Sequence, residues 1–303
     1  MKHILITGGG GQVGLELARV NWGAQIAVHT PSRAELDIAD AGSVVARFAQ
    51  HPYDAVINAA AYTAVDRAES EPERAIRVNT GAVEVLAHEM KLRDGWLVHY
   101  STDYVFDGAK PGAYDESDAP NPQSVYGRSK LAGEEAIRAS GCRHLVLRTS
   151  WVYSVHGGNF AKTMLRLAQE SAEIRVVSDQ IGAPTGADLI ADVTALALHR
   201  LSTDQELAGR AGGLYHLSAA GSTSWHGYAA LLIESARAAG AALRVMPDRV
   251  LPIASAEYPT PARRPANSLL DTARLCATFG LVMPPWQAGV RRLSLQLNQT
   301  ETS

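Results

Sequence analysis

The chain has 303 residues, 46% of them hydrophobic, which is enough for one large α/β domain, or a large and a small one, around a substantial core. A formal net charge of −3 excludes the strongly basic class that binds nucleic acid through its phosphates. No run approaches the ~20 apolar residues that span a bilayer, the start MKHILITGG lacks a secretory leader, and Cys142 and Cys276 lack metal-ligand spacing, so we expect a cytoplasmic protein without a membrane partner.

The first 150 residues alternate short apolar runs with helical patterns. Runs of this kind, nearly apolar throughout, are typical of a parallel sheet that is buried on both faces. The sequence therefore predicts an α/β fold with a Rossmann-like, doubly wound parallel sheet. Strands are expected at 3–7, 25–29, 54–58, 96–101 and 144–149, and helices at 12–20, 43–50, 71–92 and 125–140.

Beyond residue 150 the alternation loosens. Helices are expected at 159–170, 185–201 and 225–239, strands at 174–177 and 214–218, an irregular proline-rich stretch at 247–265, and disorder at 298–303. An irregular stretch within a compact chain is usually functional or a linker. The domain prediction is an NAD(P)-binding Rossmann domain over 1–155, to which about 186–220 returns, and a smaller C-terminal α/β substrate-binding region over 156–185 and 221–303.

Three glycines follow the first strand at a spacing that suits a dinucleotide. Gly8 allows a tight turn, Gly11 lets the backbone approach a pyrophosphate, and Gly14 lets the helix and strand pack closely. The amides at the start of the following helix then face the anion. The turn therefore predicts nucleotide binding.

The end of the second strand bears on the choice of cofactor. The segment 29–33 holds no carboxylate, which would bind the ribose hydroxyls of NADH, whereas Ser32 and Arg33 can hold a 2′-phosphate. We therefore favour NADPH over NADH, although Arg33 is otherwise a solvated surface charge. Asp37 and Ile38 can lie along the adenine. After the third strand, the small side chains of Ala59, Ala60 and Ala61 permit close approach of the cofactor.

Tyr126 and Lys130 are four residues apart on a predicted helix and so share a face. A lysine ammonium favours the phenolate and lowers the pKa of a neighbouring tyrosine, which prepares it to protonate a carbonyl oxygen while hydride reaches the carbon. Thr102 follows the fourth strand at the carboxyl edge of the sheet, where ligands bind in open α/β folds. Its hydroxyl can support the same carbonyl, or it caps a turn.

At this point the chain resembles the extended short-chain dehydrogenase/reductases and, among them, the dTDP-4-dehydrorhamnose reductases. The resemblance rests on segments in order along nearly the whole chain: GGGGQVG (8–14), LDIAD (36–40), NAAAYTAVDRAESEPERAIRVN (58–79), YSTDYVFDG (100–108), YGRSK (126–130), RTSWVY (148–153), DQIGAPT (179–185) and YPTPARRPANSLLD (258–271). It implies NAD(P)H-dependent reduction of the C4 keto group of dTDP-4-dehydro-L-rhamnose to dTDP-L-rhamnose, a precursor of bacterial surface polysaccharide.

The resemblance also implies residue roles. The catalytic set is Thr102, Tyr126 and Lys130. Further cofactor contacts are Gln12, Val13, Asp37, Ile38, Ala61, Tyr62, Thr63 and Tyr100. Substrate contacts are Thr102, Asp103 and Trp151, with Arg263 and Arg264 as diphosphate partners, because guanidinium binds phosphate bidentately. Trp151 can stack on a sugar face, or it is a core residue, and the two arginines are otherwise surface charges.

Some members of this family hold Mg²⁺ at a homodimer interface, and Glu16 and Asp188 match two of the carboxylates. Pro285 stands before Trp286 where an acidic residue is expected, so no metal is assigned. Two other functions compete with the reductase. A nucleotide-sugar epimerase or dehydratase shares the fold, but Thr102 is followed by Asp-Tyr rather than Asp-Glu. A non-catalytic NADP-binding regulatory subunit is opposed by the complete Thr102, Tyr126 and Lys130 set.

Overall fold

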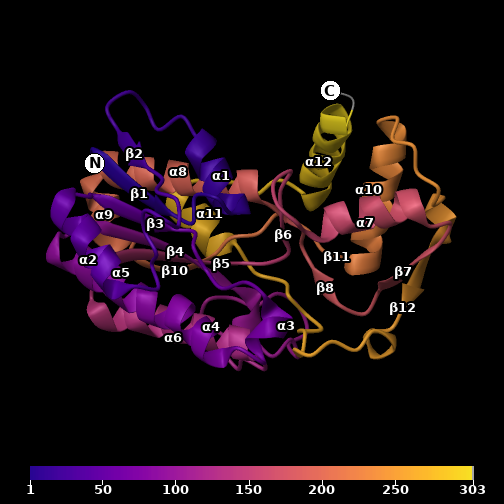
Figure 1. Ribbon diagram of the computed structural model, residues 1–303, viewed down its shortest axis with the longest axis horizontal. Coiled ribbons are helices and arrows are strands. Elements are labelled where there is room, and N and C mark those ends of the chain that lie inside the picture. The colour runs from indigo at the N-terminus through magenta and orange to yellow at the C-terminus, as the bar shows by residue number, and fades with distance from the viewer. Residues whose placement is uncertain (302–303) are drawn as a thin grey trace.

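A six-stranded parallel sheet forms the centre of the larger part of the molecule (Figure 1). The computed structural model describes the backbone of residues 1–301 and the side chains of residues 1–298. The strand order is β10-β5-β4-β3-β1-β2, which is the doubly wound arrangement predicted. The strands are β1 (His3–Thr7), β2 (Ala27–His29), β3 (Ala55–Asn58), β4 (Trp96–Thr102), β5 (Arg143–Thr149) and β10 (Gly213–His216).

Helices cover both faces of this sheet, because successive strand residues point to opposite sides. Ile4 and Ile6 of β1 belong to a core formed with the helices of one face, and Leu5 belongs to the core on the other face. The first face carries α1 (Gln12–Arg19), α8 (Ala187–Thr203), α9 (Gln205–Arg210) and α11 (Ala273–Phe279). The second face carries α2 (Ala41–Gln50), α5 (Ala82–Leu92) and α6 (Val125–Ser140).

The helix expected over 71–92 is interrupted. It consists of α4 (Pro72–Ile76), a π-helical turn η1 (Arg77–Gly81) and then α5, and a further short helix, α3 (Val65–Ala68), precedes it. The π turn brings the Asn79 side chain inward, where it accepts from the Tyr62 amide at 2.8 Å and donates to Ser129 Oγ at 3.0 Å. These bonds tie the loop after β3 to α6. The sequence pattern could not show them, because they join residues 17 and 50 positions apart in the chain.

A second apolar core lies beside the sheet, at the right of Figure 1. Its helices are α7 (Phe160–Glu170), α10 (Trp225–Ala238) and α12 (Trp286–Glu301). Its strand pairs are β7 (Ile174–Val177) with β12 (Val250–Ile253), β8 (Ile181–Gly182) with β11 (Thr223–Ser224), and β6 (Val152–Tyr153) with β9 (Thr185–Gly186). The 3-10 turns η3 (Pro247–Arg249) and η4 (Ser255–Glu257) flank β12.

The C-terminal helix corrects one expectation. Disorder was predicted for 298–303, yet α12 continues to Glu301, because Trp286, Val290 and Leu293 on one face pack into the second core against α10. The last two residues of that stretch lie outside the described part of the chain. Within the described residues, no helix is long and apolar enough to cross a membrane.

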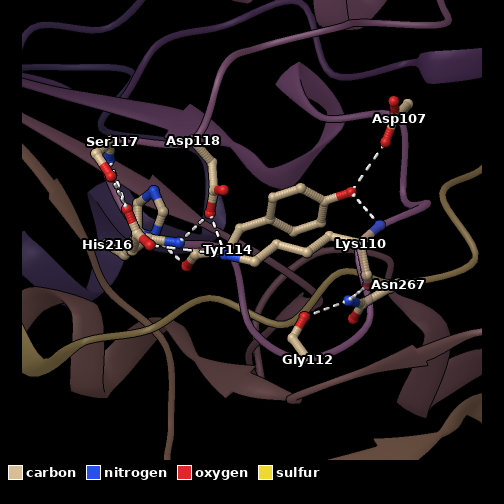
Figure 2. A network of polar contacts seen from close by, with 9 residues as sticks. Asp107, Lys110, Gly112, Tyr114, Ser117, Asp118, His216 and Asn267 are labelled. Atoms are coloured by element: carbon tan, nitrogen blue, oxygen red, sulfur yellow. Dashed lines mark hydrogen bonds and ion pairs between the residues drawn. The ribbon is translucent and has the colours of Figure 1, made fainter.

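A polar network fixes the loop after the 3-10 turn η2 (Asp103–Val105) against the C-terminal chain (Figure 2). The Tyr114 hydroxyl donates to Asp107 at 2.9 Å and accepts from the Lys110 amide at 3.0 Å. The Asn267 side chain donates to the carbonyls of Lys110 and Gly112 at 2.7 and 2.6 Å. The network holds the segment with Arg263 and Arg264 near the loop that follows β4.

Candidate active site

The glycine turn after β1 has the shape of a phosphate cradle. Gly8 has a φ of 71°, and a Cβ there would lie 2.5 Å from the Ala60 amide nitrogen. A Cβ on Gly14 would lie 2.1 Å from the Gly8 carbonyl oxygen, so this glycine permits the close packing of α1. Gly11 caps α1 without a side-chain hydrogen bond, which leaves the first-turn amides open to an anion. The turn therefore fits the pyrophosphate of a dinucleotide.

A cavity of about 590 Å³ extends from this turn past the ends of β2 and β3. The predicted cofactor residues that line it are Gly8, Gly11, Arg33, Asp37, Ile38, Ala59, Ala60, Ala61 and Tyr62. Ser32, which was expected to help hold a 2′-phosphate, also lines it. The other lining residues, to which the sequence analysis assigned no role, are Thr7, Gly9, Gly10, Thr30, Pro31, Glu35, Leu36, Arg74 and Val78. The cavity therefore joins the glycine turn to the two loops expected to hold the nucleoside.

Several predicted cofactor residues lie outside this cavity. The Gln12 side chain accepts a hydrogen bond from Asn159 at 2.9 Å, which links α1 to the start of α7. Val13 packs against the first core, and Thr63 is exposed. The Tyr100 hydroxyl pairs with Thr194 of α8 at 2.8 Å, so this ring packs on the α8 face of the sheet.

Segment 29–33 holds no carboxylate, as expected, but Glu35 beyond it lines the same cavity. Glu35 Oε2 accepts from both the amide and the hydroxyl of Ser32, each at 2.8 Å, and the backbone amide is the larger cause of the lowered pKa of this carboxyl group. Arg33 is paired with Asp37 at 3.4 Å, and Arg74 reaches the same cavity from α4. The turn after the short strand β2 places Glu35 in this cavity, although it lies two residues beyond the segment 29–33 from which the cofactor preference was predicted.

Thr102 and Tyr126 meet at the carboxyl edge of the sheet. Thr102 ends β4, and its hydroxyl accepts from the Tyr104 amide at 3.1 Å, so it also caps η2 as the alternative interpretation proposed. Tyr126 lies in the first turn of α6, which is capped by Ser124. The tyrosine is half-buried, and its hydroxyl is hydrogen-bonded to Thr102.

The electrostatics of Tyr126 differ from the expectation. Burial, and then the charge of Asp103, raise the pKa of the Tyr126 phenol, and the hydrogen bond to Thr102 opposes this only in part. Lys130 is not among the causes. The prediction that Lys130 lowers this pKa is therefore wrong, because the lysine side chain is turned toward β4. A phenol with a raised pKa keeps its proton at neutral pH, which is the form that a reduction needs.

Lys130 is 1% exposed and is held by β4. Its Nζ donates to the Tyr100 carbonyl oxygen at 2.7 Å and lies 3.0 Å from His99 Nε2. Burial lowers the pKa of the lysine to about 8, against the opposing charge of Glu134. Glu134 itself forms a buried two-point ion pair with Arg148 of β5. The helical spacing predicted the face of α6 that Lys130 occupies, and only the fold shows its partners.

Asp103, a predicted substrate contact, is 3% exposed next to Thr102. Its Oδ1 accepts from the Thr102 hydroxyl at 3.1 Å, while its Oδ2 is buried without a partner. Burial raises the pKa of this carboxyl group to about 6, and hydrogen bonds from Ser268 and Thr102 oppose that shift. A buried carboxyl with an open acceptor atom beside the phenol is suited to a hydroxyl-bearing ligand.

Of the other predicted substrate residues, Trp151 and Arg264 already contact other side chains of the chain, and Arg263 is exposed. Trp151 has a φ of 50°, which is rare for a bulky residue, and its indole stacks on Trp225 with ring centroids 3.6 Å apart. Arg264 donates to Asp66 at 2.7 Å and to the Tyr104 hydroxyl at 2.9 Å. Arg263 is exposed, and both arginines line an open cavity of about 640 Å³.

The two carboxylates considered for a metal lie in one cavity of about 250 Å³. Asp188 is ion-paired with Arg292, and Glu16 accepts from the Ser154 hydroxyl at 3.1 Å. Among the described side chains, those of residues 1–298, no group of three or more histidine, cysteine, aspartate or glutamate residues is arranged to hold a metal ion. The guanidinium groups of Arg19 and Arg292, paired with Glu16 and Asp188, supply positive charge in this cavity.

Comparison with known proteins gives a consistent result. A sequence model described as the RmlD substrate binding domain matches residues 1–298. A dTDP-4-dehydrorhamnose reductase of Salmonella typhimurium is 45% identical over 303 residues, covering 99% of each chain. A crystal structure of dTDP-4-dehydrorhamnose reductase from Bacillus anthracis in complex with NADP has a TM-score of 0.87 at 33% identity, covering 97% of this chain and 99% of that one. An ortholog from Clostridium acetobutylicum has a TM-score of 0.88 at 32% identity, covering 98% and 99%.

Proposed function

The chain belongs to the RmlD substrate binding domain family, and from that membership we propose that it reduces the C4 keto group of dTDP-4-dehydro-L-rhamnose to dTDP-L-rhamnose with NAD(P)H. The product is a precursor of bacterial surface polysaccharide. The observation that carries the proposal is the contact between Thr102, at the end of β4, and Tyr126, in the first turn of α6, at the carboxyl edge of a nucleotide-binding sheet.

The chemistry is divided between the cofactor and the chain. When bound, the nicotinamide supplies the hydride that reaches C4. Tyr126 gives its proton to the C4 oxygen, which is a far stronger base as an alkoxide than a phenolate is. Thr102 holds the phenol through its hydroxyl, and Lys130, held by the Tyr100 carbonyl, supplies positive charge to the site as an ammonium.

Different parts of the chain bind the cofactor and the sugar nucleotide in this proposal. We infer that residues 1–155, together with about 186–220, bind the cofactor, since β10 and α8 complete the large sheet and its cover. Residues 156–185 and 221–303, built on the second core, bind the sugar nucleotide against this edge. In this proposal Trp151 contacts the substrate. Arg263 and Arg264 hold its diphosphate, with Arg264 partly neutralised by Asp66.

For the cofactor we favour NADPH, with NADH accepted. Arg33 and Arg74 line the cavity beside Ser32, where they can pair with a 2′-phosphate. Glu35 lies in the same place and can accept from ribose hydroxyls in its stead. The loop after β2 therefore offers both arginines for the 2′-phosphate of NADPH and a carboxylate for the ribose hydroxyls of NADH.

The proposal is tested by supplying dTDP-glucose with the upstream dehydratase and epimerase and following the loss of NADPH and of NADH absorbance separately. Tyr126→Phe is expected to abolish turnover while cofactor binding persists, because only the phenol proton is removed. Near-full turnover by this variant would refute the assignment of Tyr126 as the acid. Oxidised cofactor bound tightly to the purified chain would instead favour an epimerase or dehydratase.

A further inference from the structure

The cavity of about 640 Å³ that Arg263 and Arg264 line also includes the neutral amide side chain of Gln180, which lies between β7 and β8. Two carboxylates reduce the positive charge of this cavity, because Asp107 lines it as well and Arg264 is paired with Asp66. Uncharged hydrogen-bond donors on its wall therefore matter for any anion that binds there.

The backbone on both sides of Gln180 is held by segments that line this cavity. Before it, Asp179 Oδ1 accepts from the Ser255 amide at 2.9 Å. After it, the Ile181 amide donates to the Ala266 carbonyl oxygen at 2.8 Å. Ser255 and Ala266 are themselves lining residues. The side chain of Gln180 therefore begins from a backbone position that hydrogen bonds fix on the cavity wall.

The direction of the Gln180 amide is set by Trp225, the first residue of α10. Trp225 Nε1 donates to Gln180 Oε1 at 3.2 Å. An indole N–H can only donate, so the amide oxygen must face the indole and the Nε2 group must point away from it. This Nε2 group has no hydrogen-bond partner among residues 1–298, and the chain does not enclose it. It is therefore an open donor on a residue of the cavity wall.

Trp225 is held in turn by two neighbouring rings. Its indole stacks on Trp151 with ring centroids 3.6 Å apart and an interplanar angle of 11°, and the Phe160 ring centroid lies 4.6 Å away. Trp151 follows β5, whose last residue, Thr149, pairs with Thr102 in the sheet register. An indole stacked in this way cannot rotate without losing these contacts, so its N–H keeps its direction toward the amide.

We propose that Gln180 is a further substrate-binding residue, which donates from Nε2 to a diphosphate oxygen of the sugar nucleotide, and that Trp225 is the positioning residue that orients its amide. The proposal rests on the proposed function, which supplies the ligand. A hydrogen bond to a charged oxygen is stronger than one between neutral groups. Because the amide oxygen is already bonded to Trp225, the N–H donor loses little rotamer freedom when the diphosphate binds.

The first experiment measures binding without turnover. The full chain is titrated with dTDP, which carries the diphosphate, and separately with NADPH, by calorimetry. Gln180→Met keeps the length of the side chain and removes the amide, so the Kd for dTDP is expected to rise about tenfold, the effect of one hydrogen bond to a charged group, while the Kd for NADPH is unchanged. The control Gln25→Met, at an exposed position before β2, should change neither. Unchanged dTDP affinity in Gln180→Met, or an equal loss for NADPH, would overturn the proposal.

The second experiment tests the positioning role of Trp225 with a double-mutant cycle. Trp225→Phe keeps an aromatic ring against Trp151 but removes the indole N–H, so the Gln180 amide loses its orientation and the Kd for dTDP should rise about threefold. The double variant Gln180→Met, Trp225→Phe should bind dTDP as Gln180→Met does, because Trp225 acts only through the amide. A merely structural Trp225 would instead give losses that add, and that result would overturn its positioning role.

The third experiment uses turnover. Gln180→Met is expected to raise the KM for the sugar nucleotide about tenfold with kcat nearly unchanged, because the diphosphate is remote from C4 and is held equally in the ground and transition states. A lower kcat at unchanged KM contradicts the proposal. If the wild type binds dTDP but reduces no sugar nucleotide, the proposed function is refuted while the binding results still decide the role of Gln180. If the wild type is active and Gln180→Met is unimpaired, the role of Gln180 alone is refuted.

Discussion

Removal of one partner from the buried Glu134–Arg148 ion pair should destabilise the chain strongly. The side chains are 8% and 2% exposed, and two hydrogen bonds of 2.9 and 2.6 Å join them. Arg148→Met keeps the apolar stem but removes both hydrogen bonds of the guanidinium, which leaves the carboxylate with the hydrogen bond from Ser101. A buried charge left unpaired costs about 3–5 kcal/mol, so we expect the free energy of unfolding to fall by that amount at pH 7.5.

The assay is equilibrium urea unfolding followed by tryptophan fluorescence. The matched control is Arg166→Met, which breaks an exposed pair with Glu170 at 2.7 Å and should change the free energy of unfolding by less than about 1 kcal/mol. The double variant Arg148→Met, Glu134→Leu should recover most of the loss, because no buried charge remains.

Two results would refute this reasoning. A loss below about 1 kcal/mol in Arg148→Met would mean that water or a rearranged neighbour solvates Glu134. A double variant as unstable as the single one would mean that the loss came from packing, for instance from the guanidinium that lies 5.0 Å from the Phe106 ring centroid.

Two further predictions concern pH and cofactor choice. Burial, and then Arg148, lower the pKa of His216 to about 4, so the folded chain binds fewer protons than the unfolded chain between pH 6.5 and 4. As pH falls through this window, the free energy of unfolding of the wild type should therefore decrease by about 1.4 kcal/mol per pH unit relative to His216→Phe. A difference between the two proteins that is independent of pH in urea unfolding would contradict this prediction. Arg33→Ala should raise the KM for NADPH about tenfold with little change for NADH, while Glu35→Gln should weaken NADH alone; equal effects on both cofactors in steady-state assays would argue against recognition at the end of β2.

The sequence by itself determined the α/β class, the glycine turn and the helical face shared by Tyr126 and Lys130. These are local properties, because hydrophobic periodicity, turn chemistry and i,i+4 spacing act over a few residues. The same local reasoning wrongly predicted disorder for the end of α12, because the apolar residues of this helix are buried only when they pack against α10.

Only the tertiary structure decided which groups act on those residues. Lys130 meets His99, 31 positions away, and Arg264 meets Asp66, 198 positions away. Helical spacing suggested that Lys130 acts on Tyr126, yet the phenol responds to burial and to Asp103. The physical reason is that hydrogen bonds and charges act over a few ångströms in space, and residues distant in sequence reach that range only when strands pair and helices pack across the sheet.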